Sequence, residues 1–256
     1  MTRDMTDLYE ILKWYIEAGV DQTCGDICCQ INKEPIKNAQ PSSFRKATTD
    51  LSQNIIASKQ NARELCSTAS TLQNLKTIVE NFDGCALKLT AKSTVFGAGN
   101  EKASLMIIGE APGADEDRIG LPFVGRSGRL LEKMLNSISL KRDDVYITNV
   151  LPWRPPGNRT PTDSEVAVCL PFLKRQIELV EPKIILLLGS SAANAVLDNS
   201  ESISRLRGKW LDYALSQNKT IPALASFHPA FLLRNGAQKA KAWVDFLRVL
   251  KKLKEN

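Results

Sequence analysis

The sequence predicts an α/β fold in which a parallel sheet is covered by helices on both faces. From about residue 94 onward, four short apolar runs alternate with longer stretches whose apolar residues recur at helical spacing. Short apolar runs are typical of strands buried on both faces, and their alternation with helices is typical of a parallel sheet. Hydrophobic residues make up 43% of the 256 residues, which is ample for a core.

Each run and each helical stretch has a definite place in this prediction. The strands are expected at 104–109, 145–150, 183–189 and 221–227. The helices are expected at 127–139, 163–180, 190–198 and 237–254. Because functional loops collect at the carboxyl ends of strands in such sheets, the loops of interest follow Gly109, Asn149, Gly189 and Phe227.

The first 93 residues are expected to form a helical extension. An N-terminal amphipathic helix lies within 1–30, a polar linker with two prolines covers 31–48, and a helical lead-in at 49–93 precedes the domain at 94–256. The N-terminus lacks the basic start and unbroken apolar core of a signal peptide, and no run of about 18 apolar residues occurs. We therefore expect a cytoplasmic protein without a membrane segment.

Positive charge is concentrated near the C-terminus. The net charge is +6, and residues 205–256 hold eleven Lys and Arg against three Asp and Glu, so the rest of the chain is slightly negative. A basic segment on a nearly neutral body suits a polyanionic partner, with nucleic acid first. A basic surface without a ligand is the alternative.

Cysteine and histidine usage limits the metal chemistry. Six cysteines are too few for a disulfide-stapled domain of this length, and no Cys-x-x-Cys pair occurs. The chain has a single histidine, which excludes a histidine-rich metal site. Any imidazole chemistry must therefore use His228.

The loop after Gly109 is crowded with glycines, acids and one aromatic residue. Gly109 and Gly113 allow close approach of a ligand to the backbone. Glu110 and the acids at 115–117 supply carboxylates, and Phe123 lies in a Pro-Phe-Val-Gly turn where a ligand would cover it. The alternative is an acidic helix start with Phe123 as local core. No Gly-x-Gly-x-x-Gly motif supports a phosphate site.

Two other strand ends carry polar side chains. Asn149 offers both a donor and an acceptor, as reading the edge of a base requires, although it could equally cap a turn. His228 precedes a proline, which disfavours helix at the histidine and presents the imidazole at the strand end, unless it is a structural histidine. The apolar tip at 231–233, followed by Arg234, has the form of a wedge into a duplex or of a helix-capping core. Arg207 and Lys209 in "RLRGKW" suit phosphates, or form an ordinary charged loop.

Six pieces of the chain, in this order, resemble the uracil-DNA glycosylase superfamily and most closely its family four. The pieces are "GEAPGADED", "GLPFVGRSGRLL", "VYITNVLPWRPPGNRTP", "IILLLGSSAA", "RGKW" and "FHPAFLLRN". The resemblance extends from about Val95 to the C-terminus and leaves residues 1–80 outside. It implies a three-layer α/β/α sandwich around a four-stranded parallel sheet, and a monomer that excises uracil from DNA in base excision repair.

The resemblance also implies roles for single residues. Phe123 would stack on the flipped uracil, Asn149 would read its Watson–Crick edge, and Ala111 would contribute backbone to the base site. Exclusion of thymine would need bulk where the chain has Gly113, and Glu116 is the candidate to supply it.

Catalysis and DNA contact complete these implied roles. Glu110 and Glu116 are the candidate catalytic carboxylates, with the water-placing one left open, and His228 would donate to uracil O2. The candidate DNA contacts are Arg159, Arg207, Lys209, Leu232, Leu233 and Arg234.

The sequence departs from the family pattern at two places. Ala111 stands where the classical enzymes carry an aspartate that activates water. Only Cys85 and Cys169 match the four cysteines that hold the iron–sulfur cluster of family four, and the other two positions read as Phe82 and Trp153. Two thiolates cannot hold a four-iron cubane, and nothing in the spacing of the remaining cysteines, Cys24, Cys28, Cys29 and Cys66, argues that they substitute. We therefore expect no cofactor, with a four-iron cluster that uses other cysteines as the alternative.

Two other functions remain open at this point. The chain could be a catalytically weak DNA-binding relative that is tied to replication, as its missing cysteines and its extra residues 1–80 would allow. It could also be a glycosylase for other deaminated or mismatched bases, which Gly113 leaves open. Residues 1–80 could dock on the domain or on a repair or replication partner.

Overall fold

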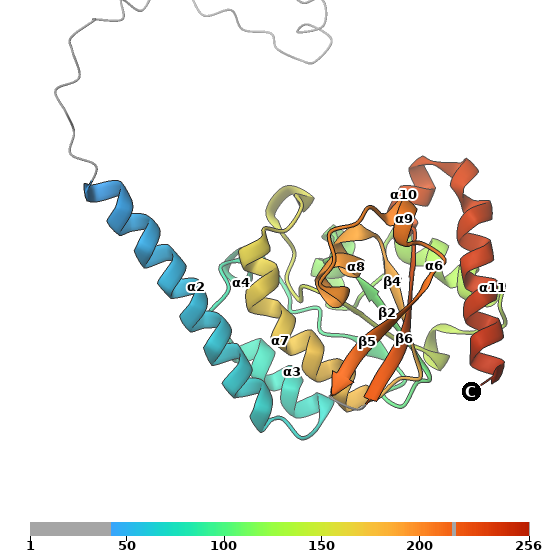
Figure 1. Ribbon diagram of the computed structural model, residues 1–256, viewed down its shortest axis with the longest axis horizontal. Coiled ribbons are helices and arrows are strands. Elements are labelled where there is room, and N and C mark those ends of the chain that lie inside the picture. Colours follow the sequence, from blue (N-terminus) through green and yellow to red (C-terminus); the bar gives the residue numbers. More distant parts are fainter. Residues whose placement is uncertain (1–41, 217–218, 256) are drawn as a thin grey trace, which may run out of the picture. The chain divides into compact units, whose positions relative to one another are not determined.

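A six-stranded mixed sheet forms the centre of the computed structural model, which describes residues 42–216 and 219–255 (Figure 1). The strand order is β1-β3-β2-β4-β6-β5. The four inner strands are mutually parallel and comprise β3 (Tyr146–Asn149), β2 (Leu105–Gly109), β4 (Ile184–Leu188) and β6 (Lys219–Ser226). They confirm the four predicted strands to within two residues at each end.

Two antiparallel edge strands correct the expectation of a four-stranded sheet. β1 (Ala98–Gly99) pairs with β3, and β5 (Trp210–Ser216) pairs with β6. The two residues of β1 are too few to give a pattern. β5 directly follows the basic "RLRGK" stretch, and its exposed and buried positions alternate without a continuous apolar run. The three-layer architecture is confirmed, with these two strands added at its edges.

Helices cover both faces of the sheet because the strand residues alternate in direction. On one face, Met106 and Ile108 of β2 pack in the core with α7 (Asp163–Val180) and α8 (Ser190–Leu197). On the other face, Leu105 and Ile107 pack with α6 (Arg126–Asn136) and α11 (Lys239–Glu255). All four predicted helices are present, and α7 has the predicted bounds.

Shorter helices occupy the connecting loops. Their bounds are α5 (Ala114–Ile119), α9 (Ile203–Leu206), α10 (Pro229–Arg234) and the 3-10 turns η1 (Arg142–Asp144), η2 (Pro156–Asn158) and η3 (Gly236–Gln238). In the residues that the structure covers, no helix is both long enough and apolar enough to cross a bilayer.

The residues before the sheet are helical wherever the structure describes them. α2 (Ser42–Thr68) begins inside the predicted linker 31–48, so the linker prediction is wrong for its last seven residues. α3 (Leu72–Asn81), which Thr71 caps, and the short α4 (Leu87–Thr90) follow and pack into the core beside α7. The predicted helix at 1–30 lies outside the described residues.

An aromatic cluster joins α3, the loop after β3 and α7. The Phe82 ring meets Phe172 edge to face, with centroids 5.0 Å apart. Trp153 is 1% exposed, and its indole N–H donates to Thr94 Oγ1 at 3.0 Å. Because the Trp153 ring is large, buried and hydrogen-bonded, it anchors the proline-rich loop to the core.

Truncating Trp153 tests this anchoring. We expect Trp153→Ala to lower the free energy of unfolding by about 3–5 kcal/mol through cavity formation. Leu89→Ala is the control, since Leu89 is 88% exposed, and its change is expected within about 0.5 kcal/mol. Urea denaturation monitored by circular dichroism measures both. A loss for Trp153→Ala no larger than that of the control would contradict the assignment.

Candidate active site

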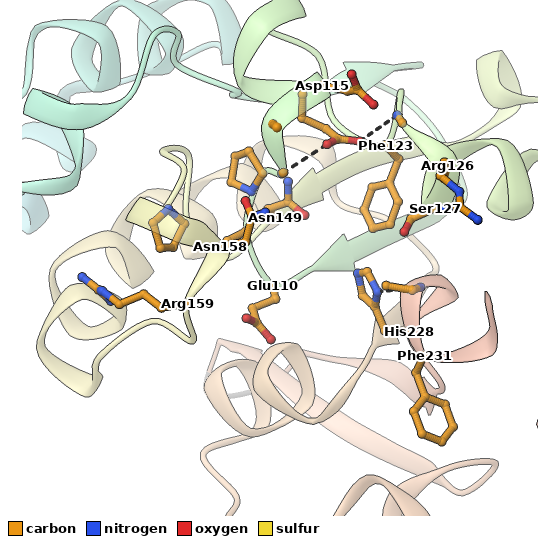
Figure 2. A pocket seen from close by; sticks show the side chains of 18 of the residues that line it. Glu110, Asp115, Phe123, Arg126, Ser127, Asn149, Asn158, Arg159, His228 and Phe231 are labelled. Atoms are coloured by element: carbon orange, nitrogen blue, oxygen red, sulfur yellow. Dashed lines mark hydrogen bonds between the residues drawn. The ribbon is translucent and has the colours of Figure 1, made fainter. Parts of the chain in front are cut away.

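A cavity of about 570 Å³ opens where the parallel strands end at their carboxyl side (Figure 2). This volume is in the usual range for small-molecule sites. The lining residues that the sequence predicted are Glu110, Ala111, Glu116, Phe123, Asn149, Arg159, His228 and Arg234. The loops after β2, β3 and β6 therefore meet at one site, as the sheet topology predicts.

Gly109 makes the closest approach between two of these loops possible. A Cβ atom at this position would lie 2.4 Å from Asn149 Oδ1 and 2.6 Å from Phe123 Cζ. Any side chain here would therefore push the carboxamide and the ring out of their positions. The last residue of β2 must be glycine for Asn149 and Phe123 to lie side by side.

Phe123 has a left-handed backbone conformation, with φ of 53°, although it is not a glycine. Such a conformation persists only where the surroundings enforce it. Arg142 donates to the carbonyl oxygens of Pro122 and Phe123, the latter at 2.9 Å. A Cβ atom at Gly128 would lie 1.8 Å from the Phe123 oxygen, so the start of α6 also lies tight against this turn.

Glu116 holds the other side of the same turn. Its Oε1 accepts from the backbone N–H groups of Val124 and Gly125 at 3.0 and 2.9 Å, and its Oε2 accepts from Gly113 at 3.2 Å. The carboxylate is buried and bonded to three backbone amides. This geometry corrects the expectation that Glu116 is a catalytic carboxylate, because it binds the loop that carries Phe123.

Asn149 presents an unengaged carboxamide to the cavity. The residue is only 6% exposed and lies beside the Phe123 ring (Figure 2). Within 42–216 and 219–255, no protein group hydrogen-bonds to this carboxamide, so its donor and its acceptor are both available to a ligand. A buried polar group of this kind is costly unless a ligand or water satisfies it.

His228 lies at the N-cap of α10 with a defined proton position. Its Nδ1 accepts from the Ala230 N–H at 3.1 Å, so in the neutral ring the proton is on Nε2. Burial, followed by the nearby positive charge of Arg234, lowers the pKa of His228 from 6.5 to about 4, and Glu116 opposes this shift. The ring lies 5.6 Å from the Phe123 ring, centroid to centroid. At neutral pH the site therefore holds a neutral imidazole with an N–H donor.

Two residues predicted to contact DNA are bound within the protein instead. Leu232 is fully buried and packs against Phe227, so the prediction that it wedges into a duplex is wrong. Leu233 beside it is 39% exposed and keeps the predicted place at the tip. Arg207 forms a 2.6 Å ion pair with the buried Asp245, so the prediction that it binds phosphate is also wrong.

The other predicted basic contacts differ in their ion pairing and in their exposure to solvent. Arg159 lines the cavity, but its guanidinium forms a bidentate ion pair with Glu165. Nη2 donates to Oε1 at 2.6 Å and Nη1 donates to Oε2 at 2.8 Å. This pair lowers the pKa of Glu165 to about 2. Arg234 is exposed at the cavity, and Lys209 is exposed outside its lining.

Sequence reasoning missed several residues that shape the site. Arg126, Ser127 and Asn158 line the cavity in addition to the predicted set, and so does Phe231 of the predicted apolar tip. Arg126 and Ser127 directly follow the Pro-Phe-Val-Gly turn and begin α6, which is a signal that the sequence did contain. Arg142 had no such signal, because it reaches the turn only through the fold.

The residues around Cys85 do not fit a four-iron cluster. Cys85 and Cys169 place their sulfur atoms 3.8 Å apart, while Phe82 and Trp153 fill the other two expected ligand positions with buried rings. Among the described residues, no group of three or more His, Cys, Asp or Glu could hold a metal ion. Cys66 does not form part of any such group, and burial raises the pKa of its thiol to about 12.

The single histidine makes the protonation state of the site directly measurable. We expect the pKa of His228 to be about 4 in an NMR titration of its ring protons. Between pH 4 and 6.5 the unfolded chain binds this proton and the folded chain does not, so His228 makes folding less favourable as the pH falls through this window. The slope is up to about 1.4 kcal/mol per pH unit. His228→Gln should remove that part of the slope, whereas a titration near 6.5 would show that the imidazole is solvated.

The comparisons with known proteins agree with this site. The family model of the uracil DNA glycosylase superfamily matches residues 96–251. A type-4 uracil-DNA glycosylase of Thermotoga maritima is 42% identical over 164 residues, covering 64% of this chain and 83% of that protein. A type-4 uracil-DNA glycosylase of Pyrobaculum aerophilum is 39% identical over 178 residues, covering 68% of this chain and 90% of that protein. A DNA polymerase of Bacillus phage SP01 is 30% identical over 139 residues, covering 54% of this chain but 14% of that protein. The chain belongs to the uracil DNA glycosylase superfamily and, within it, to the type-4 enzymes.

Proposed function

We propose that this chain removes uracil from DNA by hydrolysing its N-glycosidic bond, which leaves an abasic site for base excision repair. The observation that carries the proposal is the convergence of Phe123, Asn149 and a neutral His228 on one cavity. A protein that only bound DNA would not need an aromatic platform, an unengaged amide and a half-buried neutral imidazole in one place. The names of the relatives support the same activity.

Base recognition follows from the two groups beside Gly109. A base must leave the stack before an enzyme reaches its glycosidic bond. The flipped uracil stacks on the Phe123 ring, while Asn149 Oδ1 accepts from uracil N3–H and Asn149 Nδ2 donates to O4. Cytosine presents an acceptor at N3 and a donor at position 4, so the same amide would oppose it at both points. The amide thus separates the two bases without any charged group.

Bond breaking uses the imidazole as a neutral donor. As the C1′–N1 bond breaks, its electron pair stays on the base and negative charge builds on uracil O2. The Nε2–H of His228 donates to that oxygen, and preorganised donors of this kind contribute roughly 10²–10³ in rate. A water molecule then adds to C1′ and its proton passes to Glu110, whose side chain lines the cavity. Ala111 leaves the site without the aspartate that activates water in the classical enzymes.

The DNA contacts surround the cavity. Leu233 occupies the space that the flipped nucleotide leaves in the duplex, and Arg234 and Arg126 bind the flanking phosphates. Lys209 adds charge to the basic C-terminal half. We propose that the enzyme acts as a monomer and that residues 1–80 bind a repair or replication partner. The similarity to a phage DNA polymerase supports a link with replication.

We also propose that the enzyme acts without an iron–sulfur cluster. The aromatic side chains of Phe82 and Trp153 fix the proline-rich loop that a cluster would otherwise hold. Cys85 and Cys169 then remain a buried thiol pair.

Removal of the Asn149 amide tests the base-recognition proposal. We expect Asn149→Ala to lower the single-turnover rate of uracil excision by about 5- to 150-fold, because a bidentate pair with a base edge is worth about 1–3 kcal/mol. The assay is alkaline cleavage of an end-labelled oligonucleotide that contains one uracil. Asn136→Ala, at an exposed position at the end of α6, is the control and should match the wild type.

Two outcomes of this assay would contradict the proposal. If the wild type shifts the oligonucleotide in a gel but leaves uracil in place, the chain is a binding relative. If Asn149→Ala retains the wild-type rate, another group reads the base.

Iron content tests the cofactor proposal. We expect the protein, purified without exposure to air, to contain far less iron than one cluster per chain and to lack the visible absorption of an iron–sulfur centre. Its excision activity should be unaffected by a chelator. Stoichiometric iron that disappears in a Cys85→Ser, Cys169→Ser variant would overturn this proposal.

A further inference from the structure

A charged network lies behind the strand that leads to His228 and outside the cavity. Arg207 donates through Nε and Nη2 to the two carboxylate oxygens of Asp245 at 3.1 and 2.6 Å, and through Nη2 to the Lys241 carbonyl at 2.6 Å. The Asp245 side chain is 0% exposed and that of Arg207 is 18% exposed. Breaking a buried pair by removing one partner is strongly unfavourable. The network therefore fixes the elements that it joins.

These elements include the last two residues of β6. The Ser226 hydroxyl, which is completely buried, donates to Asp245 Oδ2 at 2.7 Å. The Gly208 N–H donates to the Ala225 carbonyl at 2.9 Å, directly beside Arg207 in the chain. The two residues that precede Phe227 are thus held through a side chain and through the main chain.

The network continues toward the cavity through aromatic contacts. The Arg207 guanidinium lies 5.5 Å from the centroid of the Phe227 ring. The Phe227 ring in turn lies 5.0 Å from the ring of Phe231, which lines the cavity (Figure 2). His228 is the residue between Phe227 and the helix that carries Phe231. Because His228 directly follows Phe227 in the chain, a displacement of Arg207 that shifts Phe227 would also shift the imidazole.

We propose that Asp245 and Arg207 are positioning residues for His228, holding the end of β6 so that the imidazole N–H meets the oxygen of the flipped base. The inference rests on the proposed role of His228. It assigns Arg207 to the interior of the enzyme, although its sequence context suggests a phosphate contact.

The test compares variants of the network with a matched change of charge on the same helix. Asp245→Asn and Arg207→Gln should each lower the single-turnover excision rate at saturating enzyme by about 10- to 100-fold, since small misplacements of a reacting group cost this much. Arg207→Lys keeps the positive charge but lacks the planar guanidinium that donates to both carboxylate oxygens of Asp245. This variant should therefore recover part of the rate. Lys251→Gln, at an exposed position of α11, should leave the rate unchanged.

Two further readouts separate positioning from a merely structural role. The affinity for uracil-containing DNA and its salt dependence should be the same in Arg207→Gln as in Lys251→Gln. The NMR titration of His228 in the network variants should move upward from about 4 toward 6.5 as the ring gains access to water. If Asp245→Asn does not fold, Ser226→Ala removes one bond to the same carboxylate without unpairing a charge, and it should show both effects on a smaller scale.

Four outcomes would count against the inference or against the role of His228 on which it rests. Network variants that melt at lower temperature but keep the wild-type rate and the low pKa of His228 would show a purely structural network. A fall of about 0.9 in the salt-dependence slope for Arg207→Gln alone would show that Arg207 contacts a phosphate. A His228→Gln variant with the wild-type rate would refute the proposed role of His228. If His228→Gln loses rate but the network variants do not, only the positioning inference is refuted.

Discussion

The site depends on the absence of a side chain at Gly109. Strand β2 ends where a Cβ atom would lie 2.4 Å from the Asn149 amide oxygen and 2.6 Å from the Phe123 ring. Only a residue without Cβ lets the Asn149 amide and the Phe123 ring come from two different loops and still meet. The remaining features of the site hold these two groups, and the imidazole opposite them, around that point.

Two charged side chains in this enzyme, Arg142 and Glu116, serve as internal supports for the site. Arg142 binds two carbonyl oxygens on one side of the Phe123 turn and Glu116 binds the amides of the next two residues on the other side, which explains how a phenylalanine persists at a positive φ. Arg159 differs from these two, because its partner is the side-chain carboxylate of Glu165 and not a backbone group. Phe123, Asn149 and His228, which line the cavity together, are uncharged at neutral pH. Arg142 and Glu116 thus fix the geometry of the Phe123 turn, while the neutral side chains of Asn149 and His228 line the cavity beside it.

Local signals made the central sheet and its helices predictable, whereas the roles of several site residues depended on distant partners. The apolar runs located the four inner strands, and the helical spacing of apolar residues located α7. Leu232 and Leu233 are indistinguishable in the sequence, and only the packing of α10 decides which of them is buried. Arg207 looked like a phosphate ligand because Asp245, its partner, is 38 residues away. Glu116 looked catalytic for a related reason, since the amides that it binds belong to a turn whose path the sequence does not specify.

The most direct test of this account is the single-turnover rate of uracil excision by Gly109→Ala. Overpacking by one methyl group typically costs about 1–3 kcal/mol, which corresponds to a rate loss of about 10- to 100-fold if it displaces Asn149 and Phe123. Gly236→Ala is the matched control, because a Cβ atom there meets nothing within 4 Å. The account predicts a folded Gly109→Ala protein that has lost most of its excision activity beside a fully active control. A folded Gly109→Ala enzyme with the wild-type rate would contradict it.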